Sequence, residues 1–264
     1  MEFTKKNAEG ASAITPTEEQ KYLFDTRGWL LVPGVLTDAE IAEMRDFCYR
    51  LKRDVTSIPP EKRFSYGGPL ERLVDHPAVV GFMNTFVADP YAGSDDGYGF
   101  RMESSFLTIR AQGDTNWGPH GGAGSLSFGH NSHIYRYQHD GVFSGLTRAV
   151  WELNPVKKGD GGTVFLTGSH KAAFDAPAST KDPHSPLWED YDCPAGSLLF
   201  FTEGITHSGT QWTNPDVDRV AIFNCYNTIG WKWHDWNPHP DALAAMPPLR
   251  RSLFRPVHCD NNKL

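Results

Sequence analysis

The stretch SLLFFTEGITHSG, residues 197–209, decides the fold class of this chain. An apolar run from Ser197 to Thr202 ends in a segment that contains Gly204, and His207 follows just before a second glycine. Short apolar runs bounded by turn residues are typical of antiparallel sheets, and glycine lets a ligand approach the backbone closely. The stretch therefore predicts a strand, a turn, and a histidine presented beside that turn.

Runs of the same kind recur along the chain from Tyr98 onward, separated by Gly, Asp, Asn and Pro. The candidate strands are Phe100–Ile109, Leu146–Leu153, Gly162–Leu166, Ser197–Thr202 and Val220–Tyr226. This sequence pattern is typical of an antiparallel sandwich or barrel. From Trp231 the chain is rich in Pro and Trp, which predicts a packed tail and no further strands.

Helices are predicted ahead of this β region. Thr17 with Gln20, and Thr37 with Glu40, have the spacing of capping boxes, which mark helix N-termini. Between them the short apolar run Trp29–Pro33 predicts a buried strand. The chain is therefore expected to be mainly β with flanking helices.

Residues 1–15 are small and polar without a hydrophobic period, which predicts a flexible N-terminal arm. No linker rich in Gly, Ser or Pro divides the remainder, so residues 16–264 are expected to form one domain. The start of the chain lacks the apolar stretch of a secretory signal, and no run approaches the roughly 18 apolar residues that span a bilayer. We expect a cytoplasmic protein that binds no membrane.

The charge balance also limits the partners. The chain has 25 Lys and Arg against 32 Asp and Glu, a net charge of −7. Sequence-independent nucleic-acid binding needs clustered Lys and Arg, so no nucleic-acid partner is expected. A small-molecule substrate is the natural expectation, and the sequence gives no indication of the oligomeric state.

Three residues suggest chemistry: His120 within WGPHGG (residues 117–122), His207, and Arg219 twelve residues after it. Taken singly, each has an ordinary interpretation. A histidine in a glycine-rich loop is usually only hydrogen-bonded, and an arginine beside Asp216 and Asp218 usually forms a surface ion pair. A guanidinium can also hold a carboxylate by two parallel hydrogen bonds.

The ordered set resembles the phytanoyl-CoA dioxygenase family of Fe(II)/2-oxoglutarate-dependent oxygenases. Besides the two histidines and the arginine, the opening FDTRGWLLVPGVLT (residues 24–37) and the run GDGGTVFLTGSHK (residues 159–171) resemble that family's usual start and mid-core turn. The resemblance implies a double-stranded β-helix, also called a jelly-roll or cupin-like fold. It also implies an oxidoreductase that uses Fe(II), 2-oxoglutarate and O2 to hydroxylate or otherwise oxidise an aliphatic C–H bond.

By the same resemblance, His120 and His207 would bind the iron. Arg219 would pair with the distal carboxylate of 2-oxoglutarate, with Ser208 beside it. Met102 and Trp151 would line the cosubstrate pocket by their position relative to the matched motifs. His170, which lies within the mid-core turn motif, is expected to be structural.

The family's usual His-x-Asp motif is broken here, because Gly122 stands two residues after His120. One interpretation is an aliphatic halogenase, in which chloride takes the open position. Another is that Glu203, Asp140 or a water supplies the third ligand. A metal-free pseudoenzyme or binding module and, more distantly, a zinc hydrolase also remain open.

The segment after the first metal motif is rich in His, Tyr and Arg, and could contact a substrate. Its candidate residues are His133, Tyr135 and Arg136. A solvated loop is the competing interpretation. Trp231, in the aromatic tail, could likewise close over the site, although packing against the sheet is the usual use of such residues.

Overall fold

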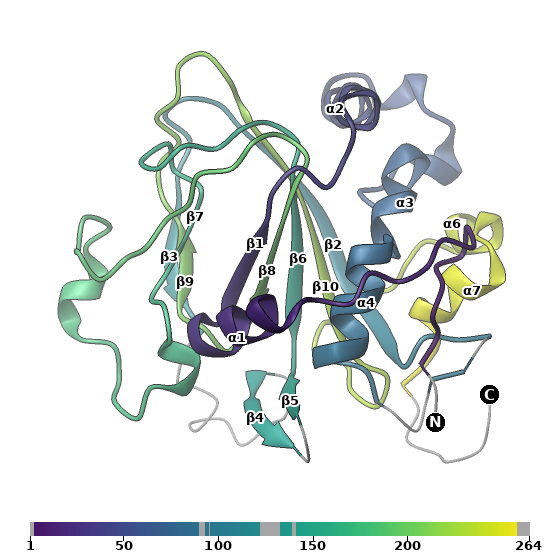
Figure 1. Cartoon of the computed structure of the whole chain (residues 1–264). Coiled ribbons are helices and arrows are strands. Elements are labelled where there is room, and N and C mark those ends of the chain that lie inside the picture. The colour runs from purple at the N-terminus through teal and green to yellow at the C-terminus, as the bar shows by residue number, and fades with distance from the viewer. Residues whose placement is uncertain (1–2, 90–92, 95, 122–132, 139–140, 258–264) are drawn as a thin grey trace.

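The computed structural model describes residues 3–89, 93–94, 96–121, 133–138 and 141–257. Two antiparallel sheets form its centre (Figure 1). The larger sheet has the order β1 (Trp29–Val32), β8 (Ser197–Thr202), β6 (Thr147–Glu152), β10 (Arg219–Thr228) and β2 (Phe100–Arg110). The smaller sheet has the order β3 (Asn116–His120), β9 (His207–Gly209) and β7 (Thr163–Phe165). A hairpin of β4 (Tyr135–Gln138) and β5 (Gly141–Ser144) is separate.

Helices cover one face of the larger sheet, and the smaller sheet lies on its other side (Figure 1). They are α2 (Asp38–Arg53), α3 (Glu71–Val74), α4 (Pro77–Phe86), α6 (Pro240–Ala245) and α7 (Pro248–Arg251), whereas α1 (Glu18–Arg27) lies at the end of β1. Both predicted capping boxes form: the Thr17 and Thr37 hydroxyls accept bonds from the third residues of their helices. The predicted arrangement, a double-stranded β-helix with flanking helices, is confirmed.

Alternation along the strands divides the apolar residues between two cores. In β6, Ala149 and Trp151 point into the core beneath the helices, whereas Val150 belongs to the core on the side of the smaller sheet. Successive side chains of a strand point to opposite faces, so this split follows from the pairing register. In the helix-side core Phe82 of α4 stacks on Phe200 of β8 with ring centroids 3.8 Å apart. The helices thus pack on the face of the larger sheet that is turned away from the smaller sheet.

The first residues that the structure describes, from residue 3 onward, pack against the helices, which differs from the predicted flexible arm. Thr4 and Asn7 are buried, and the amide of Ala8 donates to Asp75. Ile14 donates from its backbone to Pro77 at the start of α4. Polar composition alone misled the prediction, because these residues are stabilised by specific hydrogen bonds and not by a hydrophobic stripe.

The five strands predicted in the β region match β2, β6, β7, β8 and β10 to within two residues at either end. The sequence missed β3, β9 and the β4–β5 hairpin, which are short and polar. It also missed the helices between residues 71 and 86 and within the tail. Among the described residues, no helix is both long and apolar enough to cross a membrane.

The buried side chain of His170 should make the free energy of unfolding depend on pH. Its ring is buried against Tyr135, and burial lowers its pKa from 6.5 to about 4. The unfolded chain therefore binds a proton that the folded chain excludes, so the contribution of His170 is full above pH 6.5 and is lost as the pH falls towards 4. One pKa unit corresponds to about 1.4 kcal/mol, so about 3 kcal/mol is expected over this range.

The measurement is denaturant unfolding of the wild type and His170→Gln at several pH values between 7 and 4. Glutamine can still donate to the Asp25 carbonyl that faces the His170 Nε2 atom at 3.0 Å. We expect the variant to lose less stability on acidification than the wild type. Parallel pH dependences would show that His170 does not contribute.

Candidate metal centre

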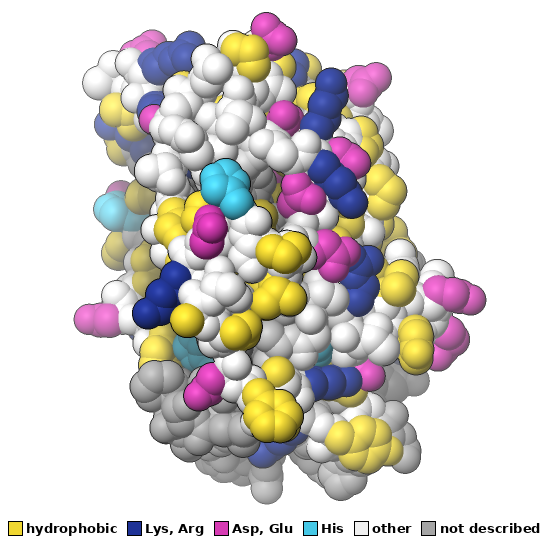
Figure 2. All heavy atoms as spheres, turned by 90° about the vertical axis from the view of Figure 1, so that its left-hand side faces the viewer, with side chains coloured by type: hydrophobic (Ala, Val, Ile, Leu, Met, Phe, Trp, Pro, Cys, Tyr) yellow, Lys and Arg dark blue, Asp and Glu magenta, His cyan; other side chains and the backbone are white. Residues whose placement is uncertain are grey.

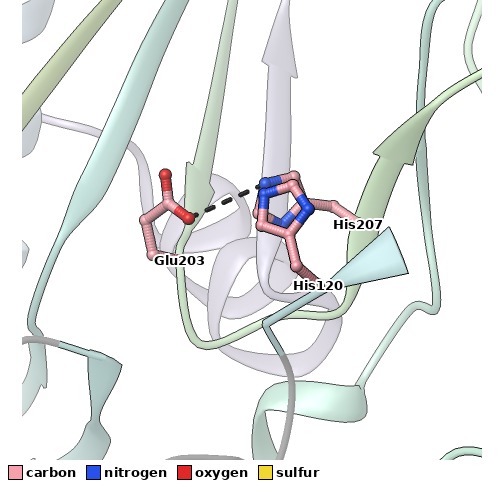
Figure 3. Close-up of side chains that lie close together, drawn as sticks. All are labelled: His120, Glu203 and His207. Atoms are coloured by element: carbon pink, nitrogen blue, oxygen red, sulfur yellow. Dashed lines mark ion pairs between the residues drawn. The ribbon is translucent and has the colours of Figure 1, made fainter. Parts of the chain in front are cut away.

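Two histidines lie side by side on neighbouring strands of the smaller sheet. His120 ends β3 and His207 begins β9, and the two are register partners in the antiparallel pairing. Their ring centroids lie 4.2 Å apart. Figure 3 shows the two rings side by side. The pairing of β3 with β9 therefore brings together residues that are 87 positions apart in the sequence.

Each ring is oriented by a backbone carbonyl two residues earlier. Nδ1 of His120 lies 2.7 Å from the Gly118 oxygen, and Nδ1 of His207 lies 3.0 Å from the Ile205 oxygen. A carbonyl can only accept, so each Nδ1 carries the proton and each Nε2 presents its lone pair. This is the usual outer-sphere arrangement of metal-binding histidines.

Glu203 completes the group. It follows β8 in the turn that leads to His207, and its Oε2 lies 3.7 Å from Nε2 of His207. Figure 3 shows its carboxylate directed at the two rings. One ligand atom from each of His120, Glu203 and His207 can be chosen so that all three lie within 4.8 Å of one another. Atoms that each sit about 2.1 Å from one metal ion are separated by roughly 3 to 4 Å, so small movements suffice.

Burial sets the protonation states of this group. Burial lowers the pKa of His207 to about 4, against the opposing effect of Glu203. Burial alone would raise the pKa of Glu203, but Arg148 and His207 lower it to about 2. At neutral pH His207 is therefore neutral and Glu203 is ionised, which are the states that bind a metal.

Arg148 holds the other oxygen of the carboxylate. Its Nε donates to Oε1 of Glu203, and both side chains are largely buried. The ion pair therefore fixes Glu203 and leaves Oε2 directed at the histidines. Two imidazoles and one oriented carboxylate form the donor set that non-haem Fe(II) uses, with further positions open for ligands. The side chains present fit such an ion.

A cavity of about 150 Å³ lies beside this group, between the two sheets. Its polar lining includes Asn116, Thr163 and Ser208, and aromatic rings of Phe106, Phe201 and Phe223 form much of the rest. Three arginines, Arg110, Arg148 and Arg219, also line it. Such a density of guanidinium groups in a small cavity favours an anionic ligand.

Arg219 begins β10, as predicted, and lines this cavity, whereas its pairing with 2-oxoglutarate stays a prediction. It is 2% exposed and is already ion-paired with Glu152, with Nη2 2.5 Å from Oε1. Burial would lower the pKa of Arg219, but Glu152 raises it above its usual value. Its Nη2 also donates to the hydroxyls of Thr163 and Tyr191. The alternative interpretation, a surface ion pair with Asp216 or Asp218, is wrong, because the partner of Arg219 is the buried Glu152.

Ser208 also lines the cavity, and its hydroxyl accepts a hydrogen bond from the Gly118 amide at 2.9 Å. It thereby ties β9 to β3 next to the histidine pair. Its hydroxyl hydrogen remains available to a ligand, so the predicted binding role stays a prediction.

Met102 and Trp151 do not line the cavity, which corrects their assignment to the cosubstrate pocket. Both are buried in the helix-side core. In β6 the side chains of Arg148, Val150 and Glu152 point to the side of the sheet on which the cavity lies. Trp151 alternates with them, so its side chain points to the opposite side. Met102 lies beyond an irregularity in the β10–β2 pairing between Cys225 and Tyr226, which moves it to the helix side.

The predicted substrate residues lie outside the cavity lining. Tyr135 packs at α1, where its hydroxyl donates to Asp25, and Arg136 lies exposed over the Phe143 ring. Trp231 is 40% exposed in the segment after β10. His133 comes nearest, because its carbonyl lies against Gly204 and its ring contacts Trp233. Asp140 and Gly122 lie outside the described residues.

Sequence reasoning missed three charged residues of the site: Arg110, Arg148 and Glu152. Each lies inside a predicted or nearly predicted strand among apolar residues. Burial of a charge inside a sheet usually requires a partner, and that alone could have drawn attention to them. The partners themselves come from distant strands and are not readable from local sequence.

A wider groove of about 570 Å³ meets the site at His120, which lines both. Its wall comes from Pro119 and Gly121, the segment 166–187, and Thr206. Two of its apolar side chains are strongly exposed, Phe174 at 87% and Leu187 at 51%. Figure 2 shows the face of the molecule that carries the smaller sheet, with hydrophobic side chains gathered in its lower half.

Comparisons with known proteins agree with this fold. The structure is similar to that of HygX from Streptomyces hygroscopicus, crystallised with nickel, 2-oxoglutarate and hygromycin B, with a TM-score of 0.64 and 21% identity over 83% of this chain and 90% of that one. It is also similar to SnoK, an α-ketoglutarate-dependent carbocyclase from nogalamycin biosynthesis, with a TM-score of 0.58 and 14% identity over 95% of this chain and 98% of that one. The non-haem monooxygenase ThoJ, as a nickel complex, gives a TM-score of 0.55 and 18% identity over 80% of this chain and 77% of that one.

These identities are low, so the structural likeness establishes the fold alone. No protein with a curated description matches the sequence significantly. The sequence model of the phytanoyl-CoA dioxygenase family, in contrast, matches residues 24–221. That range runs from α1 to β10 and includes the histidine pair, Glu203 and Arg219. The chain belongs to the phytanoyl-CoA dioxygenase family.

Proposed function

We propose that this protein is an Fe(II)/2-oxoglutarate-dependent oxygenase that oxidises an aliphatic C–H bond of a small molecule. The observation that carries the proposal is the convergence of His120, His207 and Glu203 beside an arginine-lined cavity. Family membership supports it, as does the fold shared with enzymes crystallised with iron or nickel and 2-oxoglutarate. Bound iron would supply the oxidation, coupled to decarboxylation of 2-oxoglutarate to succinate and carbon dioxide.

In this proposal the chain's own residues bind and orient. His120 and His207 hold the metal through Nε2, and their Nδ1 hydrogens keep the rings fixed on backbone carbonyls. Arg219 lines the cavity and binds the distal carboxylate of 2-oxoglutarate through Nη1, since its hydrogen bonds to the described residues go through Nε and Nη2. The aromatic rings that line the cavity exclude water from the reacting groups.

The test is an anaerobic titration of the metal-free protein with Fe(II) and 2-oxoglutarate, followed by succinate analysis after O2 is admitted. A visible charge-transfer band that requires both components, together with succinate formation, is the expected result. Absence of iron binding would remove the oxygenase proposal and leave a metal-free binding module. Retention of the band with Zn(II) in place of Fe(II) would show that the absorption does not arise from the iron complex.

We further propose that Glu203 is the third metal ligand. Its ionised, Arg148-held carboxylate is directed at the histidines, which supports a carboxylate ligand over the chloride of a halogenase. In Glu203→Gln the neutral amide should lower Fe(II) affinity at least about 10-fold, an effect at the lower end of what loss of a supporting metal-site residue costs. Isothermal titration with Fe(II) under argon measures this.

Glu189→Gln is the matched control, because Glu189 is also ion-paired with an arginine, Arg27, but lies at the surface. Its iron affinity should equal that of the wild type. Chloride separates the alternatives: addition of chloride should leave the wild-type spectrum unchanged if Glu203 fills the position. A chloride-dependent spectral shift with an unchanged affinity in Glu203→Gln would instead favour a halogenase.

The groove beside His120 is the proposed route of the substrate. Its exposed Phe174 and Leu187 would contact an apolar part of the molecule. Small molecules that stimulate succinate formation identify the substrate. For such a compound Phe174→Ala should raise KM about fivefold, since an aromatic contact is worth about 1 kcal/mol, with kcat unchanged. Tyr22→Ala, which removes an aromatic ring that is also strongly exposed but lies on α1, should change neither constant. An unaltered KM in Phe174→Ala would exclude the groove.

A further inference from the structure

Arg110 is a buried cation at the metal-centre cavity for which neither the family resemblance nor the proposed function provides a role. It ends β2, is 6% exposed, and lines the cavity together with Arg219. The two arginines are register partners in the β10–β2 pairing. Two guanidinium groups therefore enter one small cavity from adjacent strands.

The partners of the two arginines differ in charge. Arg219 is neutralised by the buried carboxylate of Glu152. Arg110 donates to the backbone oxygens of Thr210 and Gly161, each at 2.6 Å, and both acceptors are uncharged. Within the part of the chain that the structure describes, Arg110 forms no ion pair.

The charges around the cavity can be followed pair by pair. Arg148 is matched by Glu203 and Arg219 by Glu152, so Arg110 contributes the remaining positive charge. Asp114 exerts some attraction on it, but this carboxylate accepts a hydrogen bond from the Ala111 amide and is exposed. Burial and the neighbouring charge of Arg219 together lower the pKa of Arg110 to about 10, against the opposing attraction of Glu152. A desolvated cation of this kind is stabilised by an anion.

We propose that Arg110 provides the positive charge that selects a dicarboxylate cosubstrate. Arg219, whose charge is neutralised by Glu152, serves to orient the bound cosubstrate. This inference rests on the proposed function, since it concerns the same cavity. The carbonyls of Thr210 and Gly161 fix the guanidinium plane, and the remaining N–H groups would bind the distal carboxylate of the cosubstrate. Arg110 is thus a specificity-determining residue for the cosubstrate's distal carboxylate.

The experiment compares two 2-oxo acids of the same chain length, 2-oxoglutarate and 2-oxopentanoate, which carries a methyl group in place of the distal carboxylate. Dissociation constants are measured anaerobically with the Fe(II)-loaded protein for the wild type, Arg110→Met and Arg110→Lys. The ratio of the two constants within one variant does not depend on the fraction of protein that is folded. It therefore remains informative if a substitution lowers stability.

We expect Arg110→Met to weaken 2-oxoglutarate binding at least about 10-fold, the range of a charge-assisted hydrogen bond, while 2-oxopentanoate binds as before. Arg110→Lys should keep more of the preference for the dicarboxylate than the methionine variant. An unchanged ratio in Arg110→Met would overturn the inference and leave selection to Arg219. If the wild type itself binds no 2-oxoglutarate, the proposed function fails, and that outcome is distinct.

Discussion

Replacing His207 by alanine is expected to abolish iron binding and 2-oxoglutarate turnover. His207 is 6% exposed, its Nδ1 is fixed by the Ile205 carbonyl, and its Nε2 faces Glu203 and His120. No neighbouring side chain among the described residues can replace this donor. The loss in metal affinity should exceed the roughly 10- to 100-fold that removal of an outer-shell partner costs.

The measurement is metal content after dialysis against Fe(II), combined with succinate formation. His170→Gln is the matched control, because it also removes a buried histidine but lies outside the metal group. It should retain both properties at neutral pH. Full iron content in a folded His207→Ala protein would mean that His207 is a structural histidine, and the candidate site would have to be abandoned.

The sequence predicted the metal group better than the cavity around it. His120 and His207 were singled out because glycines and a strand end mark the places where side chains can meet a ligand. The family resemblance implied their metal role, and Glu203 was one candidate for the third ligand beside Asp140 and water. The order of the motifs likewise identified Arg219 as a candidate site residue. The structure then brings these residues to one point through the β3–β9 pairing, which no local pattern encodes.

The predictions for Met102 and Trp151 were wrong because family positions were transferred to this chain without knowledge of the strand register. Trp151 and Val150 are adjacent in the sequence, yet they belong to different cores. One residue of offset moves a side chain to the opposite face, so a family position transferred by counting is unreliable within a strand. Glu152 and Arg110 were missed for a related reason: their partners come from β10, the residue after β9 and the turn before β7, which are distant in sequence.

Substitution of Arg250 by methionine should cause the largest loss of stability. Arg250 of α7 is 3% exposed and donates to Asp75, Glu71 and Glu9 at 2.7, 2.7 and 3.1 Å. Asp75 is fully buried, and its other oxygen accepts from the Tyr98 hydroxyl and from the Ala8 amide. The arginine therefore joins the tail, α3 and the N-terminal segment around one buried carboxylate.

Removal of the cation alone leaves the Asp75 charge uncompensated, which costs about 3 to 5 kcal/mol in buried pairs. For a chain of this size, that corresponds to a fall in Tm of about 10 °C, measured by calorimetry. Arg72→Met is the control: its ion pair with Glu43 is partly exposed, and exposed pairs contribute about 1 kcal/mol or less. The double variant Arg250→Met with Asp75→Asn should recover part of the loss, because it removes the buried charge. Equal effects of the two single arginine variants would show that the Arg250 cluster is no stronger than a surface pair.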